Sequence, residues 1–259
     1  MDEKDVFLAD IRMALGYAKE EARDLEQCPA VFADADDSLV LDRIQYRTHV
    51  EKQALLQILQ DNGEQLRLEV HPVSSLDAAA ETIVAIIKST KPEFSTTRQI
   101  IQHDHPDLIE LGLWKRLAEE AVHVHTAYPN DSEVLEKSIE SYIGITVPRW
   151  AVAESATVVQ ITEPGRPRST SLLPSVHIAL IRLEHVLADL TEVYALLGDE
   201  PPRQSFVFIT GSSKTADIEA HMVLGAHGPR QTHLVVIDEL MVKKNTPLKG
   251  SGIFASAEI

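Results

Sequence analysis

From residue 65 onward the chain alternates between short β-rich apolar runs and longer segments with helical spacing. Strands are expected at 66–70, 98–102, 122–126, 176–183, 205–210 and 233–238, and helices at 76–89, 108–120, 132–142 and 184–197. Parallel strands joined through helices require right-handed crossovers. The rhythm therefore predicts an α/β fold: a three-layer, doubly wound, mostly parallel sheet with helices on both faces. The runs 150–154 and 157–161 are too close for a crossover and are expected to pair directly.

Two amphipathic segments, 5–25 and 41–59, precede this alternation and are expected to be helices. The second should stop at Asn62 and Gly63, which are good helix terminators. We therefore predict a helical extension (1–63), an α/β domain (64–242) and a tail without periodicity (243–259), within one globular unit. The extension is expected to pack on the sheet or on a second copy of the chain.

Charge and composition exclude several classes of protein. The 24 basic and 40 acidic residues give a net charge of −16, which argues against a nucleic-acid surface. A single cysteine, Cys28, cannot form a disulfide within the chain or hold an iron–sulfur cluster alone. No apolar run is long enough to span a bilayer, and the acidic start is unlike a signal peptide, so a cytoplasmic protein without membrane insertion is expected.

The stretch 205–219 carries the strongest local signal for a binding site. A β-rich run ends at Gly211, and residues 216–219 are typical of a first helical turn. Backbone N–H groups at a helix N-terminus, together with a lysine, can hold a phosphate or carboxylate. The predicted anion-binding residues here are Gly211, Ser212, Ser213, Lys214 and Thr215. The alternative is an ordinary helix cap beside an exposed lysine.

A carboxylate and an arginine-bearing loop are further candidates. Glu154 ends a run that looks buried, so desolvation could suit it to acid–base or nucleophilic catalysis; the alternative is a hydrogen-bonded structural carboxylate. The loop 162–171 carries Arg166, Arg168 and Ser171, which could close on an anion. A solvated hairpin loop is the alternative. We expect Glu154 and either Arg166 or Arg168 to meet Gly211 and its neighbours at the carboxyl edge of the sheet.

The histidines offer weaker signals. His103 and His105, like His123 and His125, have the i, i+2 spacing that places two side chains on one face of a strand. No spacing matches a known metal motif, so no metal and no cofactor are predicted. His177 is expected to be a core residue. His227 could be a proton donor or a loop contact, and it would lie far from Lys214 if a helical crossover separated them.

Four stretches together resemble the lactate-utilisation (LUD) domain family: Trp150-Ala-Val-Ala-Glu-Ser155, 171–180, 210–219 and Val223-Leu-Gly-Ala-His-Gly-Pro229. The resemblance implies the fold shared by glucosamine-phosphate isomerases, ribose-phosphate isomerases and CoA transferases. The family usually has glycine where this chain has Ala156 and proline where it has Ser212. A role in oxidising L-lactate to pyruvate beside separate iron–sulfur subunits is also implied.

Three functions are therefore open. The chain can be an accessory subunit of a lactate-oxidising system, a stand-alone enzyme that binds a small anionic substrate, or a structural assembly module. The sequence lacks the phosphate-binding loop of nucleotide hydrolases and the glycine fingerprint of common NAD dehydrogenases. Lys214→Ala and a screen of small anions would separate a ligand site from a helix cap. The partner classes expected are iron–sulfur subunits, a small carboxylate or other anion, and a second copy of the chain.

Overall fold

A computed structural model describes residues 3–14, 16, 37–93, 97–198, 205–216, 222–225 and 227–241. Two compact units, Met1–Leu39 and Val40–Ile259, divide the chain. In the first unit helix α1 (Glu3–Ala14) exposes Phe7 and Ile11. Cys28 and the predicted tail lie outside the described residues. No helix in the described ranges is long and apolar enough to cross a membrane.

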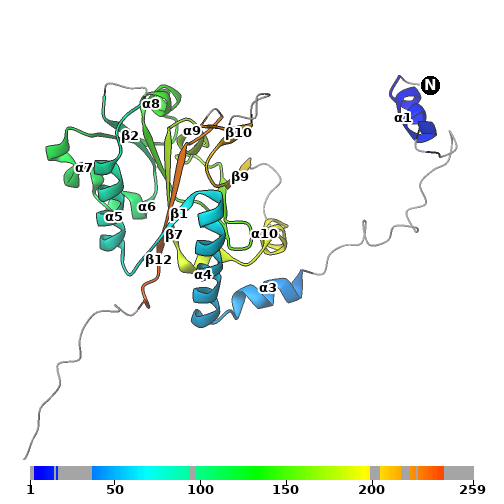
Figure 1. Cartoon of the computed structure of the whole chain (residues 1–259), viewed down its shortest axis with the longest axis horizontal. Coiled ribbons are helices and arrows are strands. Elements are labelled where there is room, and N and C mark those ends of the chain that lie inside the picture. Colours follow the sequence, from blue (N-terminus) through cyan, green and yellow to red (C-terminus); the bar gives the residue numbers. More distant parts are fainter. Residues whose placement is uncertain are drawn as a thin grey trace, which may run out of the picture. The chain divides into compact units, whose positions relative to one another are not determined.

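The second unit is built on a six-stranded sheet in which every neighbouring pair is parallel (Figure 1). Its order is β1-β12-β7-β4-β2-β3. The strands are β1 (Leu68–Val73), β2 (Gln99–His103), β3 (His123–Ala127), β4 (Ile143–Thr146), β7 (Val176–Arg182) and β12 (Gln231–Ile237). The predicted α/β class with a mostly parallel sheet is thus confirmed. Strand β4 was not predicted.

Helices cover one face of this sheet. The helix α5 (Leu76–Ser89) begins at the side-chain cap Ser75 and buries an apolar face that includes Ile83 and Ile87. Three shorter helical pieces, α6 (Pro106–Glu110), α7 (Leu113–Arg116) and η2 (Ala118–Glu120), replace the single helix expected at 108–120. Helices α8 (Val134–Glu140), after β3, and α9 (Ser169–Leu172), before β7, lie on the other face. The Thr170 carbonyl of α9 lies against Gly144, whose neighbours Ile143 and Ile145 point towards α5, and Ser138 of α8 donates to Ser169 of α9 at 3.0 Å.

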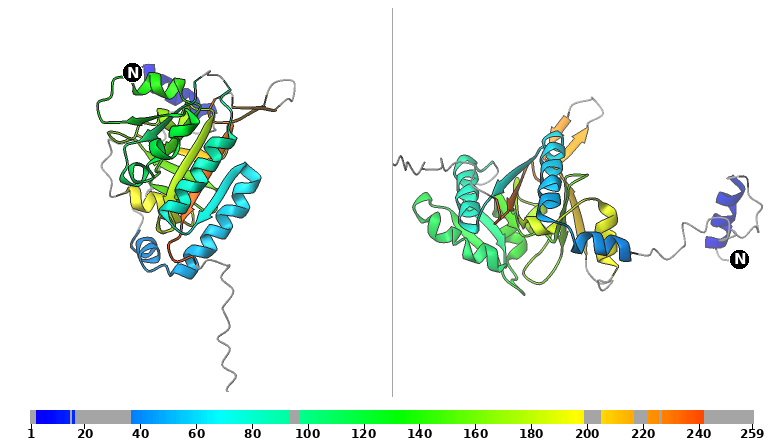
Figure 2. Two further views of the ribbon diagram at one scale, coloured as in Figure 1. Left: turned by 90° about the vertical axis from the view of Figure 1, so that its left-hand side faces the viewer. Right: turned by 90° about the horizontal axis from the view of Figure 1, so that it is seen from below.

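The other face differs from the prediction, because a small second sheet shares it with helix α4 (Figure 2). This sheet has the order β8-β5-β6-β9, where β5 is Trp150–Val152, β6 is Thr157–Ile161, β8 is Val186–Leu187 and β9 is Phe206–Thr210. The direct antiparallel pairing of β5 with β6 confirms the prediction for these two runs. The run 205–210 is a strand, but it pairs antiparallel with β6 and not with the main sheet.

Two predicted helices differ from the structure at their first residues. Residues 214–216 form strand β10 (Lys214–Ala216), which pairs with β11 (Met222–Leu224), so no helix starts at residue 216. The helix expected at 184–197 starts later: η3 (Leu183–His185) and β8 come first, and α10 (Leu190–Leu197) begins at the cap Asp189. Local apolar spacing cannot distinguish a strand of two residues from the start of a helix.

The segment before β1 forms α3 (Ser38–Gln45) and α4 (His49–Leu66). Thr48 and Glu51 form a capping box that starts α4. The helix continues past Gly63 and ends with Arg67 in the left-handed conformation, so the predicted stop was too early. A Cβ atom at Gly63 would lie 2.8 Å from the Leu68 carbonyl oxygen, so the close packing of α4 on the start of β1 requires glycine at this helical position.

Candidate functional site

A cleft of about 600 Å³ opens where the parallel strands end, and we call it the carboxyl-edge cleft. From β2 the chain moves outward to β3, whereas from β4 it moves the opposite way to β7 and β12. Open α/β sheets bind ligands outside the carboxyl ends of strands at such a reversal. His105, two residues after β2, and Val147, directly after β4, both line this cleft. The topology therefore favours this cleft as the ligand site.

Three arginines line the carboxyl-edge cleft in a chain that is strongly acidic overall: Arg149, Arg166 and Arg182. Arg166 pairs with Glu163 at 2.9 Å, and the Arg182 guanidinium bridges Asp107 at 3.0 Å and Glu239 at 2.6 Å. These pairs hold the guanidinium groups in place, and none of these arginines is fully buried. Guanidinium groups bind carboxylates and phosphates through paired hydrogen bonds.

Apolar side chains form part of the cleft wall, among them Trp150, Ile161, Ile181 and Leu196, and the carboxylates of Asp107, Glu163 and Glu184 line it as well. Arg149 lies over the Trp150 ring, 5.6 Å from its centroid. A cleft that combines an apolar wall with a few fixed polar groups is typical of small-molecule sites.

His105 supplies a neutral donor at the same cleft. Its Nδ1 accepts a hydrogen bond from the Asp107 backbone N–H at 3.2 Å, which places the ring proton on Nε2. Burial is the main cause that lowers the pKa of this imidazole; the charge of Arg166 lowers it further, and Asp107 acts in the opposite direction. At pH 7 His105 is therefore neutral and can donate a hydrogen bond to an anion without adding charge.

Only Arg166 of the sequence-predicted site residues lines this cleft. Arg168 is exposed, and Ser171 is fully buried with its hydroxyl donating to the Arg168 carbonyl oxygen at 3.0 Å. Ser171 therefore closes the turn into α9 and is not free for a ligand. Sequence reasoning missed Arg149 and Arg182, since each looked like an ordinary charged residue at the end of an apolar run.

The remaining predicted residues gather at the opposite, amino edge of the main sheet, which corrects the expected placement at the carboxyl edge. Strand β9 runs antiparallel to β6, so the turn after it returns towards the start of β12. The Ser213 backbone N–H donates to the Pro229 carbonyl oxygen at 2.8 Å, and the Ser213 hydroxyl accepts from the His227 N–H at 3.3 Å. A hairpin thus replaces the crossover, and it brings His227 to the predicted turn.

The anion site predicted at this turn depended on a helix that starts at residue 216, but residue 216 belongs to strand β10, and residues 217–221 lie outside the described part of the chain. The backbone N–H of Ser213 is already paired, Ser212 is buried, and Lys214 and Thr215 lie in the hairpin strand β10. Lys214 is exposed, whereas Asp217 and Glu219 lie outside the described residues. Gly211 has φ +67°, and a side chain there would collide with the Leu66 carbonyl oxygen. Close packing against the end of α4 therefore explains why residue 211 is a glycine.

Glu154 lies near the same edge, in the turn between β5 and β6, where Asn62 donates to its backbone carbonyl oxygen at 2.9 Å. Its side chain is exposed, so the desolvation expected for a catalytic carboxylate is absent. Ala156 in the same turn has φ +44° and is fully buried. The position therefore has the left-handed backbone that favours glycine.

Ala156→Gly is expected to leave the free energy of unfolding within about 1 kcal/mol of the wild type. Relief of the left-handed backbone gives about 1–2 kcal/mol, and loss of a buried methyl group costs about 0.8 kcal/mol. Ala153→Gly is the matched control: Ala153 is equally buried without a positive φ, so this change should only destabilise, by about 1–2 kcal/mol. Urea unfolding of both variants measures the difference, and equal losses would contradict a strained Ala156.

The predicted histidine pairs do not converge on a metal. His103 is fully buried and contacts the Pro167 carbonyl oxygen at 3.3 Å and the Gln160 amide at 3.1 Å. His125 pairs with Asp131 at 2.7 Å, while His123 is exposed. His177 is a buried core residue, as expected, and its Nε2 lies 2.8 Å from the Thr146 hydroxyl.

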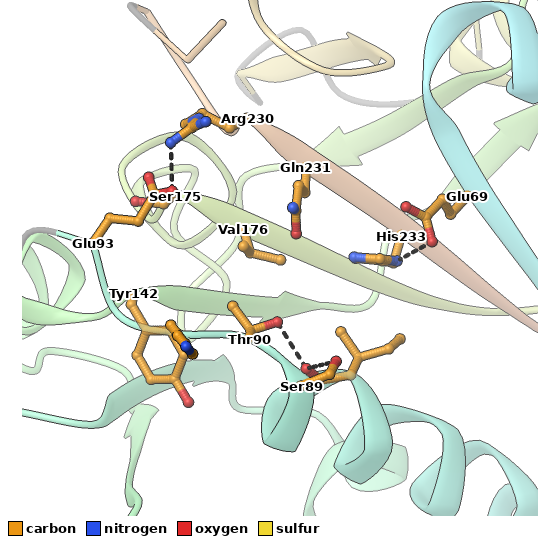
Figure 3. A pocket seen from close by; sticks show the side chains of 12 residues that line it. Glu69, Ser89, Thr90, Glu93, Tyr142, Ser175, Val176, Arg230, Gln231 and His233 are labelled. Carbon is orange, nitrogen blue, oxygen red and sulfur yellow. Dashed lines mark hydrogen bonds and ion pairs between the residues drawn. The ribbon is translucent and has the colours of Figure 1, made fainter.

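Among the described residues, one group has the donors and spacing of a metal centre: Glu69, His71 and His233. It lies beside a second cleft, of about 480 Å³, at the amino edge of the sheet, which we call the amino-edge cleft (Figure 3). Sequence reasoning missed this group because 162 residues separate His71 from His233. Only the pairing of β1 with β12 brings them together.

Comparison with known proteins adds a family. A family model described as "LUD domain" matches residues 56–237. A lactate utilization protein C from Halalkalibacterium halodurans is 35% identical over 162 residues, covering 59% of this chain and 68% of that protein. The protein of the same name from a Geobacillus strain is 31% identical over 173 residues, covering 61% and 71%. A shorter match, 40% identical over 111 residues, covers 48% of the protein of that name from an Exiguobacterium strain.

The fold also has a solved counterpart. The crystal structure of a DUF162 family protein from Deinococcus radiodurans superposes with a TM-score of 0.50 at 18% identity, and the match covers 72% of this chain and 98% of that one. At this identity the likeness concerns the fold alone.

Proposed function

Because the chain belongs to the LUD domain family, we propose that it is a lactate-utilisation protein that binds a small carboxylate in the carboxyl-edge cleft. In this proposal it is an accessory subunit in the oxidation of L-lactate to pyruvate, and separate iron–sulfur proteins carry the electrons. The observation that carries the proposal is the name shared by its similar relatives, lactate utilization protein C.

The chemistry of the carboxyl-edge cleft supports the carboxylate. The guanidinium of Arg166 and the neutral imidazole of His105 both line it. Together they can bind the two carboxylate oxygens of a 2-hydroxy or 2-oxo acid, with the methyl end against the apolar wall. The existing pair of Arg166 with Glu163 would open or share its hydrogen bonds when the ligand enters.

Arg166→Gln is expected to weaken carboxylate binding about ten- to hundredfold, because a charge-assisted hydrogen bond contributes about 1.5–3 kcal/mol. Folding should change little, since a partly exposed ion pair contributes about 0–1 kcal/mol. The measurement is a thermal-shift and calorimetric titration with lactate, pyruvate, phosphate, sugar phosphates and CoA esters.

Lys214→Ala is the matched control, since Lys214 is an exposed cation at the other edge of the sheet. It should bind lactate or pyruvate as the wild type does. Loss of binding in Lys214→Ala alone would move the ligand to the hairpin, and a response only to sugar phosphates or CoA esters would favour a stand-alone enzyme. Purification from native cells tests the partners: iron–sulfur proteins should co-purify, and their absence under mild conditions would contradict the subunit role.

A further inference from the structure

We propose that Glu69, His71 and His233 form a binding site for a divalent first-row metal ion, with zinc as the preferred ion, at the wall of the amino-edge cleft. Each of the three residues offers one ligand atom, and these atoms lie within 4.8 Å of one another. The proposal is independent of the carboxylate site, because it concerns the opposite edge of the sheet.

Two of the three ligand separations match those of a tetrahedral centre, and the third pair, Glu69 and His71, lies within 4.8 Å. The Nε2 atom of His71 and the Nδ1 atom of His233 are 3.2 Å apart, and the same Nδ1 lies 3.4 Å from the Glu69 carboxylate. With metal–ligand bonds of about 2.0–2.2 Å, ligand atoms of a tetrahedral zinc site are roughly 3.3–3.5 Å apart. An ion placed between these atoms would therefore require only small side-chain movements.

The backbone holds the three side chains on one face of the sheet. Glu69 and His71 are two residues apart on β1, and the register pairs Glu69 directly with His233 on β12. His233 is nearly buried, whereas the Glu69 side chain is 64% exposed. The buried His233 thus fixes one side of the ligand group, and the exposed Glu69 leaves the other side open to solvent.

The donor set selects the class of ion. Two imidazoles and one carboxylate suit zinc and related first-row metals, whereas magnesium and calcium prefer oxygen ligands alone. Three protein ligands leave a fourth position for water or substrate, as in catalytic zinc sites. Glu69 and His233 both line the amino-edge cleft, so the fourth position would be accessible from it (Figure 3).

The amino-edge cleft has polar groups that suit a small oxygen-bearing ligand beside such an ion. Ser89, Thr90 and Ser175 line it, and Arg230 reaches across to an ion pair with Glu93. The Ser89 and Thr90 hydroxyls already donate to the Ile86 carbonyl oxygen at 3.0 and 2.7 Å, so they can only accept hydrogen bonds from a ligand. The loop that carries Arg230 is held by the bond from its N–H to the Ser175 carbonyl oxygen at 2.8 Å. Arg230 directly follows the stretch 223–229, and Ser175 belongs to the stretch 171–180, so two of the four stretches that resemble the LUD family lead to this cleft.

The test is metal binding by the full-length chain after removal of metals with a chelator. We expect calorimetry to give about one Zn²⁺ per chain, and Co²⁺ to give the strong visible absorption of a tetrahedral site. Glu69→Gln and His71→Gln should each weaken Zn²⁺ binding at least about tenfold, since even changes of residues behind the ligands cost 10- to 100-fold. His123→Gln, an exposed strand histidine on β3, is the control and should bind as the wild type does.

Three outcomes would overturn the proposal. These are no Zn²⁺ binding by the wild type at micromolar concentration, equal binding by Glu69→Gln and His71→Gln, and equal loss in His123→Gln. Competition by excess Mg²⁺ would contradict the proposed donor chemistry. Circular dichroism of each variant shows whether it is folded. Because Glu69 is exposed, Glu69→Gln should retain the fold and keep the test decisive even if His71→Gln does not.

Discussion

Lowering the pH from 7 to 5 is expected to reduce the free energy of unfolding by about 4 kcal/mol through His103 and His177. Both are fully buried in the structure, and burial is the main cause that lowers the pKa of each to about 3. For His103 the Pro167 carbonyl opposes this shift, whereas His177, Arg166 and His105 add to it. For His177 the neighbouring His233 adds to it.

The sign follows from which state binds the proton. Above pH 6.5 both histidines are neutral whether the chain is folded or unfolded, so they add no pH dependence. Below pH 6.5 the unfolded chain takes up protons while the folded chain does not, until the pH approaches 3. Because pH 5 lies about 1.5 units below the ordinary histidine pKa of about 6.5, protonation stabilises the unfolded state by about 2 kcal/mol for each histidine.

Urea unfolding at pH 7, 6 and 5 measures this loss. His103→Gln and His177→Gln should each remove about 2 kcal/mol of the loss between pH 7 and 5, although each will also lower stability at pH 7 by disturbing buried contacts. Burial also lowers the pKa of His71, His105, His185 and His233, so these side chains add to the loss in the same direction and part of the pH dependence should remain in both variants. The control is His123→Gln, which alters an exposed side chain and should retain the wild-type slope. A slope that is the same in all four proteins would contradict the assignment. Carboxyl groups titrate mainly below this pH window and contribute little to it.

The sequence predicted the fold class because that information is local. Short apolar runs separated by amphipathic helices are enough to indicate parallel strands and crossovers, and most of these elements are present. Strand partners are not local information. The run 205–210 has the composition of a central parallel strand, but its backbone pairs with β6 in a second sheet. That pairing reverses its direction and moves Gly211 and Lys214 to the amino edge.

The candidate site was predictable only in part, for the same reason. Arg166 was recognisable from the sequence because it lies in an arginine-bearing loop. Arg182 is held at the cleft by its ion pair with Asp107, which is 75 residues away in the chain and cannot be inferred locally. The proposed metal ligands likewise depend on the contact between the first and last strands of the sheet. The catalytic role predicted for Glu154 assumed that its side chain is buried. The apolar run before it did not show that Glu154 itself lies in an exposed turn.

Gly211→Ala is expected to destabilise the protein by about 2–5 kcal/mol, and the result would distinguish a packing glycine from a ligand-binding one. A Cβ atom at this position would lie 2.1 Å from the Leu66 carbonyl oxygen and 3.0 Å from its carbon, both backbone atoms at the end of α4. The left-handed backbone adds a cost of about 1–2 kcal/mol, and overpacking adds about 1–3 kcal/mol.

Two other glycines separate these contributions. Gly112 has φ +60°, but a Cβ atom there would lie 3.8 Å from the Glu110 carbonyl oxygen, an ordinary van der Waals distance, so Gly112→Ala should cost only the strain of the left-handed backbone. Gly144 has an ordinary φ, but its Cβ atom would lie 1.7 Å from the Thr170 carbonyl oxygen, so Gly144→Ala tests overpacking alone.

Denaturant unfolding of the three variants, with pyruvate and phosphate titrations of each, decides the role of Gly211. We expect Gly211→Ala to be less stable than Gly112→Ala while any carboxylate affinity is retained, because its turn lies across the sheet from the carboxyl-edge cleft. A Gly211→Ala protein as stable as Gly112→Ala would contradict the close approach to α4. If it were stable and had lost anion binding, the turn after β9 would be a ligand site after all, and Lys214 would be the first side chain to test there.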